Sequence, residues 1–259
     1  MKLVTWNVNG IRARKDDVLA FVEGERPDVL CLQEIKALSG QIPAPLNELP
    51  GYWCYWHGMK GYSGVALLVR KDFSTDAPRF SHPEFDHENR IVVADLLSDG
   101  GAVSVASIYV PNGGRSLETK LGFLQELLAY GAAAQRLGRR IVLCGDLNVA
   151  RTELDVHPRE RNPTLVGQRP EERALFERIL TEGNLRDVGR DLDPTNDALF
   201  TWWAPWRKMR ERNIGWRLDY VLATATLAAR ATSCVSLREV GTSDHGPVVA
   251  VFDGLGGQA

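Results

Sequence analysis

The sequence has 259 residues, of which 44% are hydrophobic and 25% charged, with a formal net charge of -2. A chain of this size can bury one large core, and the nearly balanced charge excludes a global attraction to nucleic acids. No apolar stretch reaches the ~18 residues of a membrane-spanning helix, and no room for a secretory signal precedes the first apolar run. The four cysteines are widely spaced, which is typical of free thiols in a reducing compartment and of neither disulfides nor a zinc site. We therefore expect a cytoplasmic protein with no membrane partner.

Short apolar runs rich in valine recur along the chain and predict strands. They are residues 3–8, 29–32, 64–69, 91–96, 103–110, 141–147, 218–222 and 248–252. Between them, residues 16–25 and 117–137 carry apolar side chains at helical spacing, and residues 170–184 begin with Pro170 and nearly end with Gly183, which are helix boundary signals. Several strands follow one another without a helix, which favours two packed sheets with helices outside over a doubly wound sheet.

No low-complexity linker divides the chain. The stretch richest in proline, glycine and polar residues, 157–173, separates two segments that look like parts of one core, so we interpret it as a functional surface loop. We therefore predict an α/β sandwich that forms a single domain over residues 1–259.

Polar side chains stand where the predicted strands end. Asp146 and Asn148 follow the apolar run 141–144, and because side chains two apart in a strand share a face, they would point the same way. An Asx turn that closes the strand is the structural alternative. Asp219 lies inside an apolar run, where an ionised carboxylate needs a partner, and His245 is a natural candidate. Further polar interruptions are Asn7, Glu34, Tyr109 and Asp244.

Each interruption alone has a structural explanation as a turn residue, a helix cap or a packing side chain. Together they suit hydrolysis of a phosphodiester. Carboxylates hold a hard divalent cation, another acid can take a proton from water, and His, Tyr and Asn can bind phosphate oxygens. The sequence holds no glycine-rich phosphate loop or dinucleotide motif, so we expect no nucleotide cofactor.

Arginines and lysine gather among tryptophans near residues 202–217, a combination that suits phosphates and bases. A solvated charged face is the usual explanation for a basic run, and core packing is the alternative for the tryptophans. The cluster contains Trp202, Trp203, Trp206, Arg207, Lys208, Arg210, Arg212, Trp216 and Arg217.

Six motifs, in order along nearly the whole chain, resemble the exonuclease III family of AP endonucleases within the endonuclease/exonuclease/phosphatase superfamily. The intact 215–220 segment is more similar to the branch specialised in abasic sites. The motifs are Trp6-Asn7-Val8-Asn9-Gly10, Leu32-Gln33-Glu34-Ile35-Lys36, Tyr109-Val110-Pro111-Asn112, Gly145-Asp146-Leu147-Asn148-Val149-Ala150, Asn213-Ile214-Gly215-Trp216-Arg217-Leu218-Asp219-Tyr220 and Ser243-Asp244-His245.

The resemblance implies a four-layered α/β sandwich of two mixed sheets flanked by helices, the DNase I-like fold. It also implies Mg²⁺-dependent cleavage of double-stranded DNA 5′ to an abasic site, with Mn²⁺ as a substitute. The sequence does not determine the oligomeric state, and a monomer is the default expectation. Glu34 would be the main metal ligand, with Asn7 and Asp244 contributing. Asn9 stands where some relatives carry Asp, which puts a second metal position in doubt.

By the same resemblance, Asp146 would activate or align the attacking water, which Asn148 and Asn7 would orient. Tyr109 would hold the phosphate, and His245, paired with Asp219, would bind the scissile phosphate. A carboxylate partner favours the charged form of that histidine.

Other matching positions concern DNA. Arg12, Lys36 and Tyr62 would contact the phosphate backbone, and Arg115 would lie near the lesion. The apolar pocket for a flipped abasic sugar would consist of Trp202, Trp216 and Leu218. Trp206 replaces a smaller side chain and would either wedge into the duplex or shield its groove.

We expect strong AP endonuclease activity with weaker 3′-to-5′ exonuclease or 3′-phosphodiesterase activity. The first alternative is a nonspecific DNase I-like nuclease, or a phosphatase of inositol phosphates or sphingolipids, on the same fold. The second is a DNA-binding module without catalysis, which the complete set of acids and His245 disfavours.

Overall fold

The computed structural model describes residues 1–257 and contains two six-stranded sheets packed face to face. The first has the strand order β11-β12-β1-β2-β4-β3 and the second β5-β6-β7-β8-β10-β9. In the first sheet the strands are β1 (Lys2–Asn7), β2 (Val29–Gln33), β3 (Tyr52–Met59), β4 (Tyr62–Arg70), β11 (Ala231–Ser236) and β12 (Val248–Phe252). In the second they are β5 (Arg79–Ser81), β6 (Ile91–Ser98), β7 (Gly101–Tyr109), β8 (Ile141–Asp146), β9 (Leu185–Asp187) and β10 (Asp219–Thr224).

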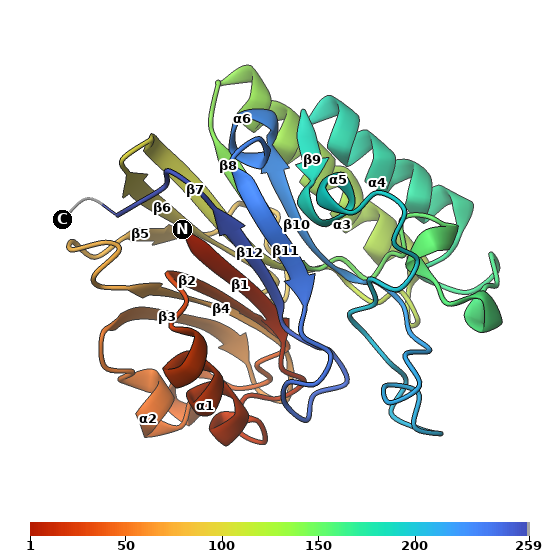
Figure 1. Ribbon diagram of the computed structural model, residues 1–259, viewed down its shortest axis with the longest axis horizontal. Helices are drawn as coiled ribbons and strands as arrows, with labels where there is room; N and C mark the ends of the chain where they lie inside the picture. The colour runs from red at the N-terminus through yellow and green to blue at the C-terminus, as the bar shows by residue number, and fades with distance from the viewer. Residues whose placement is uncertain (258–259) are drawn as a thin grey trace.

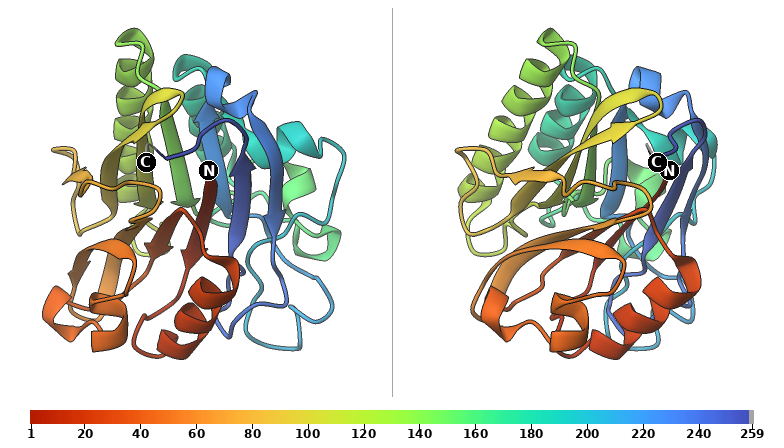
Figure 2. Two further views of the ribbon diagram at one scale, coloured as in Figure 1. Left: turned by 60° about the vertical axis from the view of Figure 1, so that its left-hand side comes forward. Right: turned by 90° about the vertical axis from the view of Figure 1, so that its left-hand side faces the viewer.

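Helices cover the outer faces of both sheets (Figure 1). The helices are α1 (Lys15–Glu25), α2 (Ala44–Asn47), α3 (Leu117–Arg136), α4 (Pro170–Glu182), α5 (Val188–Leu192) and α6 (Ala225–Ala228). α1 and α2 pack on the first sheet, and α3 and α4 pack side by side on the second, as the turned views also show (Figure 2). Both sheets contain parallel and antiparallel pairs. The predicted four-layered α/β sandwich is confirmed.

Each central strand is buried on both faces, and this explains the continuous apolar runs in the sequence. Leu3 and Cys31 point into the core between the two sheets, while Val4 and Leu32, one residue further on, pack against the helices. The three predicted long helices correspond to α1, α3 and α4, and the eight predicted strands correspond to β1, β2, β4, β6, β7, β8, β10 and β12.

Four strands were not predicted, and all are short or lie at sheet edges. β3 and β11 are edge strands whose side chains are mostly half-buried. β11 lacks an apolar run, and β3 begins with aromatic residues and a cysteine instead of the valines that mark the predicted strands. β5 and β9 have three residues each, too few to show a period. The short helices α2, α5 and α6 were missed for the same reason.

The four cysteines are free thiols, with Cys31 and Cys144 buried in the core, as expected. Among residues 1–257, no helix combines the length and the apolar character needed to cross a membrane. The single domain remains a prediction, and its last two residues, 258–259, lie outside the described part of the chain.

Candidate active site

Strand pairing brings the predicted polar residues to one rim of the sandwich. Asn7 ends β1, and Glu34 follows the last residue of the parallel strand β2. In the second sheet Tyr109 pairs with Asp146 at the parallel ends of β7 and β8, and Asp219 pairs with Asp146 at the start of antiparallel β10. Because the two sheets face each other, these ends meet.

Asn7 connects the two sheets through its side-chain amide. Its Nδ2 donates to Glu34 Oε1 and to Asp146 Oδ2, each at 2.9 Å, and its Oδ1 accepts from the Asn9 backbone N–H at 3.0 Å. In this orientation Asn7 presents N–H groups to both acids, which favours a role as a donor over one as a metal ligand.

Asp146 and Asn148 share a tight turn after β8. The backbone N–H of Asn148 donates to Asp146 Oδ1 at 2.9 Å, and its side-chain amide donates to the Val110 carbonyl oxygen at 2.9 Å. Asn148 has a φ of 52°, a left-handed conformation that asparagine tolerates better than most residues. Gly145, with a φ of 143°, must lack a side chain because a Cβ atom would overlap the Ile108 carbonyl oxygen.

The histidine and the buried aspartate of β10 form a pair. His245 Nδ1 lies 2.8 Å from Asp219 Oδ2, and the Thr201 hydroxyl donates to the same oxygen at 2.6 Å. On the other side of the ring, His245 Nε2 lies 3.9 Å from Asp146 Oδ2. Burial alone would lower the pKa of His245, but the charges of Asp219 and Asp146 raise it to about 10. The imidazole is therefore charged at neutral pH.

The acids of the rim differ in pKa because their surroundings differ. Burial raises the pKa of Asp146 to about 7, with the nearby charges of Asp219 and Glu34 acting in the same direction and that of His245 opposing them. Burial also acts to raise the pKa of Glu34, but hydrogen bonds from Asn7 and Lys36 outweigh it and lower the pKa. Glu34 is therefore ionised at neutral pH, while Asp146 is poised to exchange a proton.

The oxygen atoms at this rim are suitable ligands for a hard divalent cation. Glu34, Asp146 and Asp219 offer carboxylate oxygens, and within residues 1–257 the buried Asp219 Oδ1 has no hydrogen-bond partner. Glu34 Oε2 accepts from Lys36 Nζ at 2.7 Å, an ion pair that a cation on Glu34 would loosen. Asp244 lies further out, where its carboxylate accepts from Asn9 Nδ2 at 2.8 Å and from Trp202 Nε1 at 3.1 Å. Oxygen-rich sets of this kind suit Mg²⁺ better than zinc or copper.

Tyr109 is buried beside these acids. Burial, together with the charges of Glu34 and Asp146, holds the pKa of its hydroxyl well above the usual value. The hydroxyl keeps its proton and can donate it to a phosphate oxygen. The guanidinium of Arg90 stacks on the ring at 4.8 Å.

Trp202, Trp216 and Leu218 form one apolar wall next to His245. The two indoles meet edge to face with ring centroids 5.6 Å apart, and Trp202 lies 6.5 Å from the His245 ring. Leu218 packs in the same small cluster. Trp203 instead packs among the buried side chains of the 200–214 loop, which agrees with the core-packing alternative for this tryptophan. Trp206 is 60% exposed at the tip of that loop.

Cationic and aromatic side chains line a second corner of the rim. Arg115 lies over the Tyr62 ring at 5.5 Å, and Arg90 donates to the Tyr62 hydroxyl at 2.6 Å. These residues and Tyr109 border a cavity of about 320 Å³. Arg12 is exposed in the turn after β1, and Lys36 is half-buried beside Glu34.

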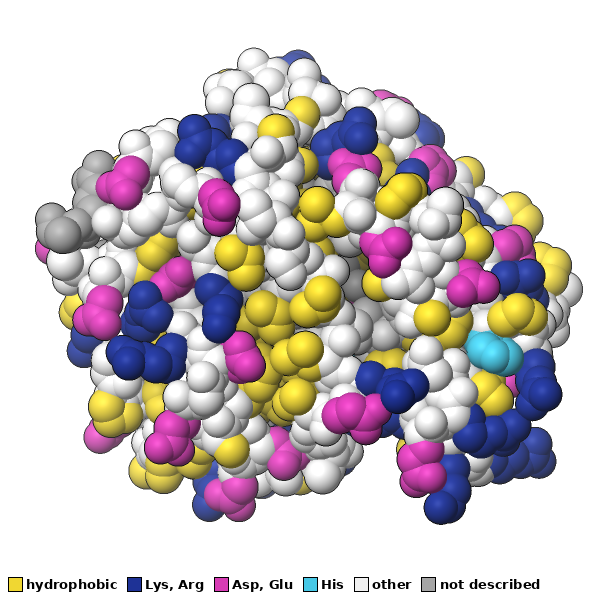
Figure 3. Space-filling view, viewed as in Figure 1, with side chains coloured by type: hydrophobic (Ala, Val, Ile, Leu, Met, Phe, Trp, Pro, Cys, Tyr) yellow, Lys and Arg dark blue, Asp and Glu magenta, His cyan; other side chains and the backbone are white. Residues whose placement is uncertain are grey.

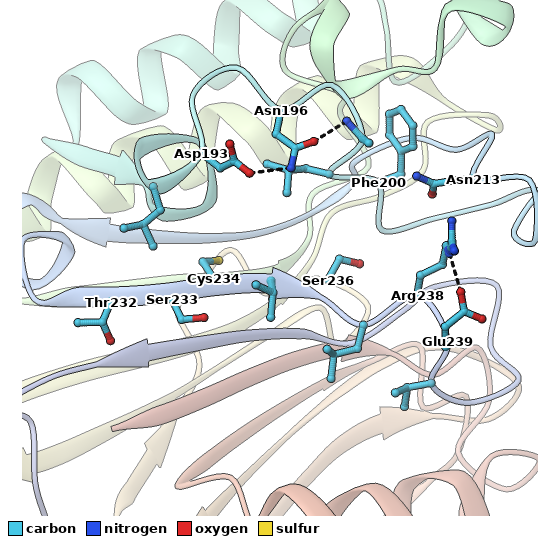
Figure 4. A pocket seen from close by; sticks show the side chains of 16 residues that line it. Asp193, Asn196, Phe200, Asn213, Thr232, Ser233, Cys234, Ser236, Arg238 and Glu239 are labelled. Atoms are coloured by element: carbon cyan, nitrogen blue, oxygen red, sulfur yellow. Dashed lines mark hydrogen bonds and ion pairs between the residues drawn. The ribbon is translucent and has the colours of Figure 1, made fainter.

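A hollow of about 760 Å³ lies beside β11 and is lined by none of the predicted site residues (Figure 4). In the space-filling view, Lys and Arg side chains gather at the lower right, where the ribbon of Figure 1 shows the loops that precede β10 (Figure 3). The exposed basic residues of these loops are Arg159, Arg161, Arg207, Lys208 and Arg212. The charge of the molecule is therefore locally uneven despite the small net value.

Sequence reasoning missed three residues that hold the site in place. Thr201 binds Asp219, Asn112 Nδ2 donates to Asn148 Oδ1 at 3.2 Å, and the buried Arg90 supports Tyr62 and Tyr109. Thr201 and Arg90 carry no local pattern that distinguishes them. Asn112 could have been found, because it ends the motif Tyr109-Val110-Pro111-Asn112.

Comparison with known proteins decides the family. The family model described as "Endonuclease/Exonuclease/phosphatase family" matches residues 4–245. The chain belongs to this family. It is 33% identical to the exodeoxyribonuclease of Bacillus subtilis over 258 residues, which cover 98% of this chain and 100% of the relative. It is 36% identical to the DNA repair nuclease APEX1 of Danio rerio over 260 residues, which cover 96% of this chain and 81% of the relative.

Solved structures of the same family superpose over nearly the whole chain. An AP endonuclease from Archaeoglobus fulgidus has a TM-score of 0.85 at 32% identity, covering 98% of this chain and 99% of its own. The 3′ phosphatase NExo from Neisseria, bound to a product DNA hairpin, has a TM-score of 0.84 at 29% identity with the same coverage of 98% and 99%. Both confirm the DNase I-like sandwich for this member of the family.

Proposed function

We propose that this protein is a DNA-repair endonuclease that hydrolyses the phosphodiester 5′ to abasic sites in double-stranded DNA, leaving a 3′-hydroxyl and a 5′-deoxyribose phosphate. The observation that carries the proposal is the placement of the Asp146–His245–Asp219 cluster directly beside an indole-lined apolar wall. The cluster supplies phosphodiester chemistry, and the wall supplies a reason for an abasic substrate. The names of the relatives and structural neighbours support the same conclusion.

In the proposed reaction, water attacks the phosphorus and the P–O3′ bond breaks, so the upstream strand leaves with a 3′-hydroxyl. Asp146 either accepts a proton from the water or orients the water for attack. Its pKa of about 7 suits a base at neutral pH. Asn7 and Asn148 hold the carboxylate through hydrogen bonds at 2.9 Å each. The leaving oxygen takes its proton from solvent.

Two side chains bind the phosphate. The charged His245, oriented by Asp219, offers its Nε2–H to a phosphate oxygen, and Tyr109 offers its hydroxyl. A divalent cation, Mg²⁺ with Mn²⁺ as a substitute, would be held mainly by Glu34, with Asp244 nearby. When bound it offsets the negative charge of the phosphate and of the leaving oxygen.

Substrate choice would come from the wall of Trp202, Trp216 and Leu218. A pocket closed by two indoles admits a sugar without a base and excludes a normal nucleotide by size. Tyr62, Arg115, Arg12 and Lys36 would contact the DNA backbone, and the exposed Trp206 would shield or wedge the groove.

We infer a monomer that acts in the cytoplasm, because one chain supplies the complete cluster and its thiols are free. Weaker 3′-to-5′ exonuclease or 3′-phosphodiesterase activity would use the same cluster. A nonspecific DNase I-like nuclease is the second candidate, favoured only by the shared fold.

The test is incision of a duplex that carries one tetrahydrofuran abasic analogue, beside the same duplex without the lesion. With Mg²⁺ we expect cleavage 5′ to the lesion, loss of cleavage in EDTA, and losses of at least about a hundredfold for Glu34→Ala and Asp146→Asn. The matched control is Asp76→Asn, which changes an exposed acid outside the cluster and should keep full activity.

Equal cleavage of the intact duplex would replace the abasic proposal with the nonspecific nuclease. Incision that survives both EDTA and Asp146→Asn would refute the mechanism.

A further inference from the structure

A second group of metal-binding side chains lies outside the candidate active site. It consists of His57 on β3, His82 just after β5, and Asp86 in the segment before β6. β3 is an edge strand of the first sheet and β5 an edge strand of the second, and both lie on the same side of the molecule (Figure 1). The group therefore joins the two sheets at one open edge of the sandwich.

The three side chains converge. His57 Nε2 lies 2.5 Å from Asp86 Oδ2, and the His57 and His82 rings stack with centroids 4.1 Å apart. One ligand atom from each residue lies within 4.8 Å of the other two. His82 is exposed, so its ring can turn toward an ion that the other two residues hold.

Asp86 is fixed by the backbone. Its Oδ1 accepts from the N–H groups of Arg90 at 2.7 Å and Ile91 at 3.0 Å, which directs Oδ2 at the histidines. The Asp86 side chain is 5% exposed and that of His57 is 17% exposed, so both ligands are preorganised in a largely dry setting. Asn89 Nδ2 lies 3.1 Å from His57 Nδ1 and 3.3 Å from Nε2. An ion on Nε2 leaves the proton on Nδ1, so the Asn89 amide would turn its oxygen toward that N–H to orient the ring.

We propose that His57, His82 and Asp86 bind one transition-metal ion of the Zn²⁺ class, with water at the fourth position. Two imidazole nitrogens and one carboxylate oxygen are ligands that Zn²⁺ accepts in tetrahedral sites. The oxygen-rich cluster around Glu34 and Asp146 differs in kind and suits Mg²⁺. The ion would cross-link β3 to the 82–91 segment. It would stabilise the packing of the two sheets, because the three ligands come together only in the folded chain.

The experiment is calorimetric titration of the full-length protein with Zn²⁺ in a large excess of Mg²⁺, which occupies the oxygen-rich cluster. The test variant is His82→Ala, whose exposed side chain can be removed without opening the core. The matched control is His87→Ala, an exposed histidine five residues along the same segment. Asp86→Asn is a second test variant, because it keeps the acceptor for Arg90 and Ile91 but loses the ligand charge.

We expect one Zn²⁺ equivalent in the wild-type protein and in His87→Ala, and at least tenfold weaker binding of that equivalent in His82→Ala and Asp86→Asn. At a hundredfold excess of Zn²⁺ over the wild-type Kd, the wild-type Tm should rise by roughly 5 °C, and that of His82→Ala by about half as much or less. Equal Zn²⁺ affinity in all four proteins, or an equal loss in His87→Ala, would overturn the assignment. These readouts measure binding and stability, so they are independent of nuclease activity.

Discussion

At the residue scale, the site depends on one carboxyl group and one imidazole whose pKa values are raised for different reasons. Burial and neighbouring carboxylates raise the pKa of Asp146 to about 7, and the carboxylates of Asp219, Asp146 and Asp244 raise that of His245 to about 10 despite its burial. Between these values Asp146 is a carboxylate and His245 an imidazolium, with 3.9 Å between Oδ2 and Nε2. A base and a phosphate-binding cation thus coexist at neutral pH.

This pair predicts a bell-shaped dependence of kcat/KM on pH. The rate should rise as pH increases through about 7, because Asp146 loses its proton, and fall as pH increases through about 10, because His245 loses its own. Steady-state kinetics on an abasic duplex across this range is the measurement. If Asp146→Asn keeps the same ascending limb in its residual activity, the group that titrates there is not Asp146.

Asp219 acts through His245 and is a positioning residue. In Asp219→Asn we expect kcat to fall at least about a hundredfold, because the imidazolium loses its carboxylate partner. The descending limb of the pH profile should also move to lower pH, since the pKa of His245 drops with the loss of that charge. A lower rate with an unmoved limb would indicate only structural damage.

At the scale of elements, loops and helices outside the central strands fix the strand ends. Lys120 of α3 is fully buried, donates to the Asn148 carbonyl oxygen at 2.6 Å and pairs with Glu172 of α4 at 2.5 Å. The outer helices thus hold the turn that carries Asn148. On the other side of the site, the 200–218 loop delivers Thr201 to Asp219.

Thr201 offers a test of this loop. Its hydroxyl accepts from the backbone N–H groups of Leu218 and Asp219, each at 3.0 Å, so Thr201→Val leaves two buried donors unpaired. We expect a loss of about 3 kcal/mol in the free energy of unfolding, measured by urea titration, together with a lower kcat. Thr201→Ser keeps the hydroxyl and should lose less than about 1 kcal/mol. Similar stability of both variants would show that the hydroxyl does not hold the loop.

At the scale of the whole molecule, the two sheets bring their strand ends to one rim. The basic side chains of Arg12, Lys36 and Arg115 lie near that rim, although the net charge of the chain is -2. Binding to a polyanion would therefore depend on a few local charges. The salt dependence of the binding constant should show which basic residues contact phosphates when they are removed one at a time, because each phosphate contact releases counterions from the DNA.

Arg115, over Tyr62 at the rim, is the charge to test. Affinity falls as salt rises, and Arg115→Ala should make the negative slope of log K against log salt concentration less steep by about 0.9 for binding to abasic duplex, measured by fluorescence anisotropy with Ca²⁺ in place of Mg²⁺. Arg136→Ala removes an exposed charge at the end of α3 and should leave the slope unchanged. Equal slopes in all three proteins would place Arg115 off the DNA path.

Much of this protein can be predicted from local sequence. Alternation along a strand and helical spacing are properties of neighbouring residues, so the central strands, α1, α3 and α4 were found, and so were the polar residues Asn7 and Asp146 at strand ends. Two edge strands were missed for different reasons: β11 is half-buried and has no apolar run, while β3 has an aromatic run without the valines that mark the predicted strands.

The tertiary structure alone decided how the polar residues meet. The hydrogen bonds from Asn7 to Glu34 and Asp146, the contact of Thr201 with Asp219, and the approach of His57 to Asp86 join segments of different strands and sheets. Their distances, and the pKa values that follow from them, depend on the register and packing of two sheets. Local sequence therefore determined which chemical groups are available, while long-range packing determined their partners and charge states.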